Sequence, residues 1–221
     1  MTHLDTEISR LKTDLNEMFS IVITQVEKSK TALFNLDKDL AREVKVNERR
    51  VNSFELKLDR DCENIIALFN PVAVDLRFVL ASLKINSNLE RIGDIAESIA
   101  LYVIDLKLEP EKELLEVSRL NEMYETAISM MLDVMKAYET ENTTLARGVF
   151  MKDEILDEIN SNANESVGAF ISHHPDRVNQ ALYALSAIRK LERVGDQCKN
   201  IAEEIIFYIE AKVLKHKKGL L

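Results

Sequence analysis

The hexapeptide LERIGD at residues 89–94 returns as LERVGD at residues 191–196. Each copy lies in a long stretch with helical spacing of apolar residues, where a glycine costs roughly 1 kcal/mol relative to alanine. A glycine that recurs at the same place therefore indicates a packing or binding requirement. Glu90 with Asp94, and Glu192 with Asp196, stand four residues apart and share one helix face. Because like charges at that spacing repel, each pair favours a nearby cation.

The composition indicates an all-α protein. Only 5 glycines and 3 prolines interrupt 221 residues, and 46% of the residues are apolar. Few turns leave long elements between them, with enough apolar side chains for a sizeable core. The net charge of -9 argues against nucleic acid as a partner, because phosphate contacts need a basic face.

Other features predict a cytoplasmic protein. No apolar run approaches the roughly 20 residues that span a bilayer, so we expect no direct membrane insertion. The N-terminal sequence MTHLD is too polar for a signal peptide. Cys62 and Cys198 do not suggest a disulfide scaffold, and both lie on apolar seams as small buried side chains. The expected compartment is therefore reducing.

Apolar residues spaced three and four apart predict six long helices. Asn70-Pro71 and Pro175 each end a helix, since proline cannot continue the hydrogen-bond ladder. The sequence Glu109-Pro110-Glu111 breaks the pattern midway, and a basic segment at 215–218 follows the last helix. The predicted helices cover residues 4–33, 40–69, 72–108, 113–138, 145–171 and 176–213.

The second half of the chain repeats the first. LNEMF at residues 15–19 returns as LNEMY at residues 120–124, and Pro71 has its counterpart in Pro175. Because separate segments match in the same order along the chain, the sequence indicates an internal repeat. We predict two tandem, pseudo-symmetric antiparallel three-helix bundles, at residues 1–110 and 111–221.

Oxygen-bearing side chains form rows on these helices. At 100° per residue, Glu90, Asp94 and Glu97 fall on the outer surface, away from the apolar seam. A second row lies beside the seam of the preceding helix, and an antiparallel hairpin could bring the two rows together. That second row is Glu48, Asn52, Glu55 and Asp59 in the first half, and Asp153, Asp157, Asn160 and Asn164 in the second half.

Such rows suit hard cations. Oxygen ligands favour Mg²⁺, Ca²⁺, Mn²⁺ or ferric iron over Zn²⁺ or Cu⁺. The alternative interpretation is an ordinary solvated acidic face, as expected on any acidic protein. The sequence lacks a phosphate-binding loop, a nucleophile elbow, a His-Glu-x-x-His zinc motif and the Glu-x-x-His of di-iron bundles, so no catalytic residue is predicted.

The sequence resembles the PhoU family over nearly its whole length. The resemblance is carried by NPVAVDLR at residues 70–77, by both copies of LERxGD, by NIAEEIIF at 200–207 and by IEAKVLKH at 209–216. It implies two three-helix bundles, frequently dimeric, with metal clusters on acid-rich surfaces built from Glu/Asp-x-x-x-Asp motifs. It leaves iron, manganese, magnesium and zinc open, as divalent or trivalent ions in multinuclear sites.

The motif carries over to two sets of residues, one in each repeat. The predicted metal ligands are Glu48, Asn52, Glu90 and Asp94 in the first, and Asp153, Asp157, Glu192 and Asp196 in the second. In the first set Glu48 is followed by Asn52 and not by aspartate. Glu97 becomes Lys199 in the second repeat, so the two sites need not bind the same metal load.

The resemblance also implies a regulator and not an enzyme. Such proteins restrain phosphate uptake and phosphate-starvation signalling, between the ATPase subunit of the phosphate ABC transporter and a phosphate-sensing histidine kinase. These partners would hold a homodimer at the inner face of the membrane. Two alternatives stay open: a carboxylate–metal enzyme on a helical bundle, and a structural bundle without a ligand.

Overall fold

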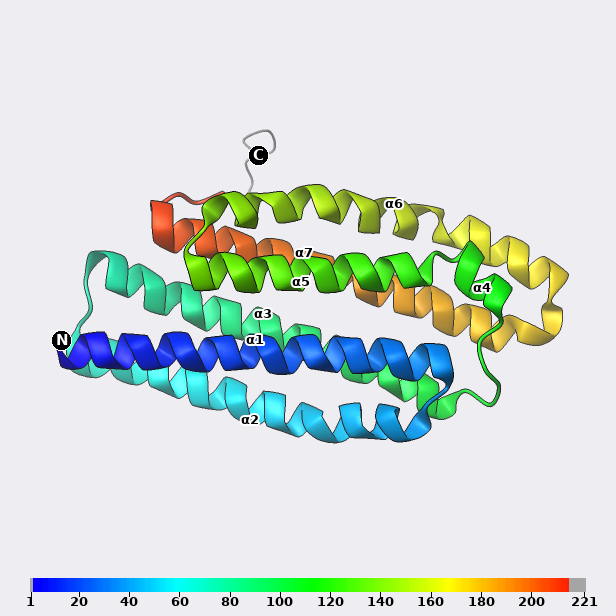
Figure 1. Cartoon of the computed structure of the whole chain (residues 1–221), viewed down its shortest axis with the longest axis horizontal. Helices are drawn as coiled ribbons and strands as arrows, with labels where there is room; N and C mark the ends of the chain where they lie inside the picture. Colours follow the sequence, from blue (N-terminus) through cyan, green and yellow to red (C-terminus); the bar gives the residue numbers. More distant parts are fainter. Residues whose placement is uncertain (1, 215–221) are drawn as a thin grey trace.

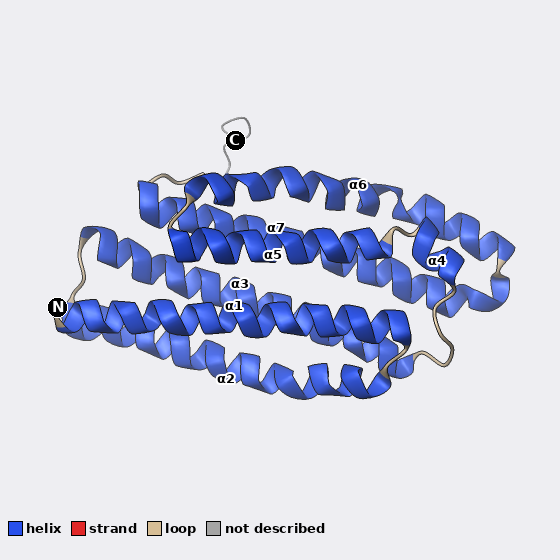
Figure 2. Cartoon of the chain, viewed as in Figure 1, coloured by secondary structure: helices blue, strands red, loops and turns tan. Residues whose placement is uncertain are grey.

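The computed structural model describes residues 2–214, and the basic segment at 215–218 lies outside that range. The described residues form helices and no strand, which confirms the predicted all-α class (Figure 2). The elements are α1 (His3–Asn35), α2 (Lys38–Phe69), α3 (Ala73–Asp105), α4 (Lys112–Val117), α5 (Leu120–Thr140), α6 (Thr143–His173), the 3-10 helix η1 (Pro175–Arg177) and α7 (Val178–Glu210).

The long helices form two antiparallel three-helix bundles, as predicted. Helices α1, α2 and α3 make the first bundle, and α5, α6 and α7 make the second (Figure 1). The bundles lie along each other, with α3 packed against α7 and α1 against α5. Over residues 2–214, no helix is both long enough and apolar enough to span a membrane.

Equivalent caps begin the second helix of each bundle. The side chain of Asp37 accepts hydrogen bonds from the backbone N–H groups of Asp39 and Leu40 at the start of α2. Asn142 does the same for Thr144 and Leu145 at the start of α6. Such side chains satisfy N–H groups that have no partner within the helix. The same type of N-terminal cap therefore begins the second helix of both bundles.

The predicted helix over 113–138 is broken in two. Helix α4 ends at Val117, and Arg119 takes a left-handed conformation (φ 50°) before α5 begins. The Arg119 guanidinium donates hydrogen bonds at 2.8 Å to Glu122 and Glu158, which hold it in that conformation. Two helices also end earlier than predicted: α3 ends at Asp105 and not at residue 108, and α7 ends at Glu210 and not at residue 213.

One hydrophobic core runs through both bundles. Aromatic side chains from the two bundles pack against each other at one end of the molecule. The ring centroids of Phe19 and Tyr138 lie 5.7 Å apart, and those of Phe78 and Tyr208 lie 5.5 Å apart. Polar contacts cross the same interface, where Tyr102 Oη and Ser186 Oγ lie 2.7 Å apart.

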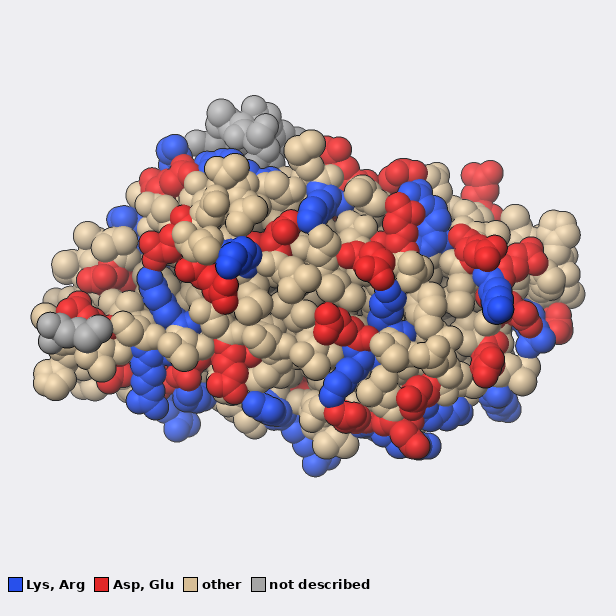
Figure 3. Space-filling view, viewed as in Figure 1, with Lys and Arg blue, Asp and Glu red and all other residues tan. Residues whose placement is uncertain are grey.

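On the face shown in Figure 3, acidic and basic side chains are interspersed.

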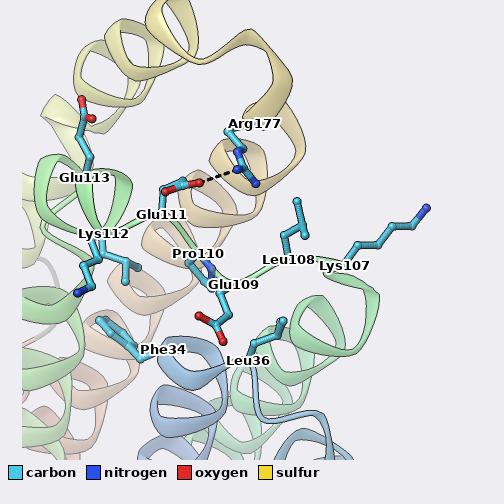
Figure 4. Close-up of a pocket in the computed structure, with 11 residues that line it drawn as sticks. Phe34, Leu36, Lys107, Leu108, Glu109, Pro110, Glu111, Lys112, Glu113 and Arg177 are labelled. Atoms are coloured by element: carbon cyan, nitrogen blue, oxygen red, sulfur yellow. Dashed lines mark ion pairs between the residues drawn. The ribbon is translucent and has the colours of Figure 1, made fainter.

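The linker between the bundles is fixed by one buried glutamine. Gln180 on α7 donates a hydrogen bond to the backbone oxygen of Glu109 at 3.0 Å and accepts one from the N–H of Glu111 at 3.3 Å. Arg177 also pairs with the Glu111 carboxylate at 2.8 Å (Figure 4). An open groove of about 860 Å³ separates this linker from Phe34 at the end of α1.

Candidate metal centre

In the first bundle, the glycine of the repeated hexapeptide faces a buried carboxylate. Glu48 on α2 is 3% exposed. A Cβ atom added to Gly93 on α3 would lie 3.0 Å from Glu48 Oε2 and 3.0 Å from Val51 Cγ1. Any side chain here would crowd both neighbours, so glycine makes room for the carboxylate between the helices.

The second bundle repeats this arrangement more tightly. Asp153 on α6 is 4% exposed. A Cβ atom on Gly195 of α7 would lie 2.6 Å from both Asp153 Oδ1 and Leu156 Cδ1. The two glycines of the hexapeptides therefore have one and the same packing role.

We define the first cluster as the acidic side chains around Glu48. Burial raises the pKa of Glu48 to about 8, with further contributions from the charges of Asp94, Glu97 and Glu90. Burial, Asp94 and Glu55 likewise raise the pKa of Glu90. The first cluster comprises Glu48, Glu55, Asp59, Glu90, Asp94 and Glu97.

In residues 2–214, no member of the first cluster forms an ion pair, although the charge of Arg91 acts on Glu90. Neither carboxylate oxygen of Glu48 has a hydrogen-bond partner there, and no ion pair within 4.0 Å involves a member of the cluster. Asn86 on α3 orders one end, since its amide donates at 2.9 Å to Asp59 Oδ1 and at 2.9 Å to the backbone oxygen of Glu55. A buried carboxylate without a partner is costly, so this site favours an added cation.

The second cluster contains its own cation. It comprises Asp153, Asp157, Glu192, Asp196 and Lys199. Lys199 Nζ lies between two carboxylates, in contact with Asp153 Oδ2 and 2.8 Å from Asp196 Oδ1. Burial lowers the pKa of Lys199, but the hydrogen bonds to the two aspartates outweigh it, and the pKa lies above its ordinary value.

The structure brings the predicted rows together and corrects one expectation. Glu90 and Asp94 on α3 lie close enough to Glu48 on α2 to raise its pKa, as an antiparallel hairpin requires. However, Glu48 and Asp153, which were predicted to lie beside the apolar seam, are buried between the helices. The prediction treated each helix alone, whereas the glycine on the facing helix decides how deep a side chain sits.

The other predicted ligands are more accessible. Asn52, Asp94 and Asp157 are exposed, and Glu90, Glu192 and Asp196 are partly exposed. Sequence reasoning did not include Asn86 in the site, although it stands one helical turn before Glu90, where a polar residue on the same face is a usable signal.

The first cluster has the chemistry of a hard-cation site but not its assembled geometry. Among residues 2–214, no three or more acidic, histidine or cysteine side chains are placed to hold a metal ion together. The unpartnered oxygens of Glu48 are nevertheless ligands of the kind that such an ion takes.

Fold and site define a class: a duplicated helical-bundle protein in which each copy buries a carboxylate against a glycine of the facing helix. The PhoU domain model matches residues 15–103 and 120–205, one match in each bundle. The chain therefore belongs to the PhoU family.

Known relatives match over almost the entire chain. The phosphate-specific transport system accessory protein PhoU of Edwardsiella tarda is 32% identical over 213 residues, which are 96% of this chain and 87% of that protein. The protein of the same name from Escherichia coli K12 is 30% identical, over 96% of this chain and 88% of its own length.

Solved structures confirm the architecture. The crystal structure of PhoU from Pseudomonas aeruginosa matches with a TM-score of 0.89 and 28% identity, over 95% of this chain and 100% of that one. The phosphate transport system regulatory protein PhoU from Streptococcus pneumoniae matches with a TM-score of 0.84 and 25% identity, over 96% and 99%. These names belong to accessory and regulatory proteins and not to enzymes, in agreement with the sequence.

Proposed function

We propose that this chain is a negative regulator of phosphate uptake and of phosphate-starvation signalling. It would act as an adaptor between the ATPase subunit of a phosphate ABC transporter and a phosphate-sensing histidine kinase. The family match in both bundles carries this proposal, together with the accessory role named for the relatives. A cytoplasmic homodimer at the inner face of the membrane, held there by these partners, is part of the proposal.

Metal ions belong to the same proposal. The candidate ligands are the eight predicted residues, and the first cluster is the better supported set because Glu48 is buried without a partner. A bound ion would supply the positive charge that the carboxylates lack. Glu48 would hold it from α2 and Glu90 and Asp94 from α3, so the ion would fix the distance between two helices that present the adaptor surface.

The enzyme alternative has less support. A catalytic metal usually sits in a shaped and dry cavity, and Asp94 is instead exposed. The open groove at the linker is lined by none of the first-cluster residues. Both observations favour a regulatory surface over a site of turnover.

Regulation can be tested in a bacterium that lacks its own PhoU and carries a phosphate-starvation reporter. We expect the chain to lower reporter output at high phosphate and to capture the transporter ATPase and the kinase from membranes. The matched control is Gly148→Ala, at an exposed position of α6 where an added Cβ atom meets nothing within 4 Å, and it should behave like the unaltered chain. An unchanged reporter with no enrichment of either partner would sink the proposal.

A further inference from the structure

The two clusters differ at one position that decides their charge. Glu97 and Lys199 each stand three residues after the aspartate of the hexapeptide, so they occupy equivalent places on α3 and α7. In the first bundle that place adds a carboxylate beside Glu48. In the second it adds an ammonium group in contact with Asp153.

Two neighbouring positions change the charge in the same direction, and one, Asn52 against Asp157, changes it in the opposite direction. Glu55 and Asp59 of the first bundle correspond to Asn160 and Asn164 of the second, so two carboxylates become neutral amides. Arg189 also approaches that end, donating a hydrogen bond to Asn164 Oδ1 at 3.1 Å. The second cluster is thus less acidic and is supplied with cations by the chain.

The buried carboxylates show the outcome. Both oxygens of Glu48 lack a partner within residues 2–214, whereas Asp153 keeps one oxygen unpartnered and places the other against Lys199. Lys199 lies on α7, so its contact with Asp153 ties α6 to α7, while its contact with Asp196 at 2.8 Å lies within α7. This bridge between helices is the role that the proposed function gives to a metal ion in the first bundle.

We propose that Lys199 takes the place of the metal ion in the second repeat, so that this chain binds hard cations such as Mn²⁺ at the first cluster alone. This inference rests on the proposed function for the metal role of the first cluster. It predicts that charge at the two equivalent positions, 97 and 199, decides which bundle takes up metal.

Mn²⁺ binding to the full chain tests the inference. After treatment with a chelator, Mn²⁺ is titrated calorimetrically and the bound metal is counted by elemental analysis. Glu97→Lys should weaken binding at least about tenfold, as loss of a supporting group at a metal site does, with helicity by circular dichroism unchanged. Lys199→Glu should bind more Mn²⁺ per chain than the unaltered protein.

Matched variants control for net charge. Glu27→Lys on exposed α1 and Lys107→Glu in the exposed linker make the same charge changes elsewhere and should leave Mn²⁺ binding unchanged. If Lys199→Glu does not fold, Lys199→Gln removes the ammonium without adding a carboxylate, and its binding of extra Mn²⁺ would equally support the inference.

Three results would overturn it: an unaltered chain that binds no Mn²⁺, binding that survives Glu97→Lys but is lost in Asp196→Asn, or no gain in either Lys199 variant. The reporter assay separates this failure from that of the proposed function. Regulation without the expected Mn²⁺ pattern would refute only the present inference, whereas the expected pattern without regulation would refute the adaptor role.

Discussion

At the residue scale, a missing side chain decides where charge can be buried. Gly93 and Gly195 each leave a gap in one helix, and a carboxylate from the neighbouring helix fills it. Within a helix, glycine costs up to about 1 kcal/mol relative to alanine. Glycine is nevertheless present at both positions, because a Cβ atom there would contact the buried acid directly.

Alanine substitutions should therefore change stability in opposite directions at different glycines. Gly195→Ala should lower the free energy of unfolding by about 1–3 kcal/mol, since its Cβ would overpack Asp153 and Leu156 at 2.6 Å. Gly148→Ala meets nothing within 4 Å and should raise it by about 0.5–1 kcal/mol. Urea unfolding monitored by circular dichroism measures both, and two changes of the same sign would contradict the packing role.

Glu48 gives a second prediction at this scale. In chelator at pH 7.5, Glu48→Gln should raise the free energy of unfolding by about 1–3 kcal/mol, because folding forces the buried acid without a partner to take up a proton, and a neutral amide avoids that cost. Added Mn²⁺ should then stabilise the unaltered chain but not the variant. Glu27→Gln, on an exposed face of α1, is the control. Loss of stability in Glu48→Gln would show that the acid is satisfied in the metal-free protein.

At the element scale, single side chains fix the ends and connections of helices. Gln180 holds both sides of the linker, and Arg147 on α6 holds the last residue of α7. Its guanidinium donates two hydrogen bonds to the Glu210 carboxylate, at 2.8 and 3.1 Å. Neither contact follows from helical periodicity, since each joins segments far apart in sequence.

Removing the glutamine should release the linker. Gln180→Leu keeps the side chain's bulk but leaves the Glu111 N–H and the Glu109 oxygen without their partner. We expect a loss of about 1–3 kcal/mol in the free energy of unfolding. Trypsin should also cleave faster after Lys107 or Lys112, which border the linker. Asn179→Ala, at the exposed neighbouring position, should change neither measurement.

The Arg147–Glu210 pair predicts a dependence on pH. The hydrogen bonds from Arg147 hold the pKa of Glu210 below its ordinary value. A lowered folded-state pKa stabilises the protein above the unfolded pKa of about 4.5, and this contribution fades as pH falls below that value. For a partly exposed pair, Arg147→Met should cost about 0.5–1 kcal/mol at pH 7 and progressively less below pH 4.5. A difference from the unaltered chain that persists undiminished at pH 3 would contradict this assignment, and Arg60→Met is the exposed control.

Helix identity was largely predictable from the sequence, and the exceptions have local causes. Apolar spacing and proline placed the hairpins correctly. The break at Arg119 carries no glycine or proline, and ion pairs to Glu122 and Glu158 hold it instead. How deeply the side chains of Glu48 and Asp153 are buried depends on the facing helix. Angular positions around a single helix carry no information about that neighbour.

At the scale of the whole molecule, the two bundles share one core. Helix α3 packs on α7, and aromatic rings from both bundles meet at one end. The repeat was readable from the sequence, but this shared interface was not, because periodicity gives the apolar side of a helix without naming the helix that covers it.

A buried charge in either bundle should therefore destabilise both. Leu191 is fully buried in the common core, and Leu191→Asp should cost more than about 4 kcal/mol. Hydrogen exchange should show amides of α1 losing protection along with those of α7. The exposed Leu182→Asp is the control. Intact protection of α1 in Leu191→Asp would mean that the halves unfold independently.

The ammonium group of Lys199 is covalently part of the chain. No chelator can extract it, and no shortage of metal in a cell can deplete it. On the proposal above, one hairpin keeps a permanent tie between its helices while its twin gains or loses that tie with metal supply. Duplication would then have given a single polypeptide one hairpin whose helices stay linked under all conditions, beside a second hairpin whose link depends on bound metal.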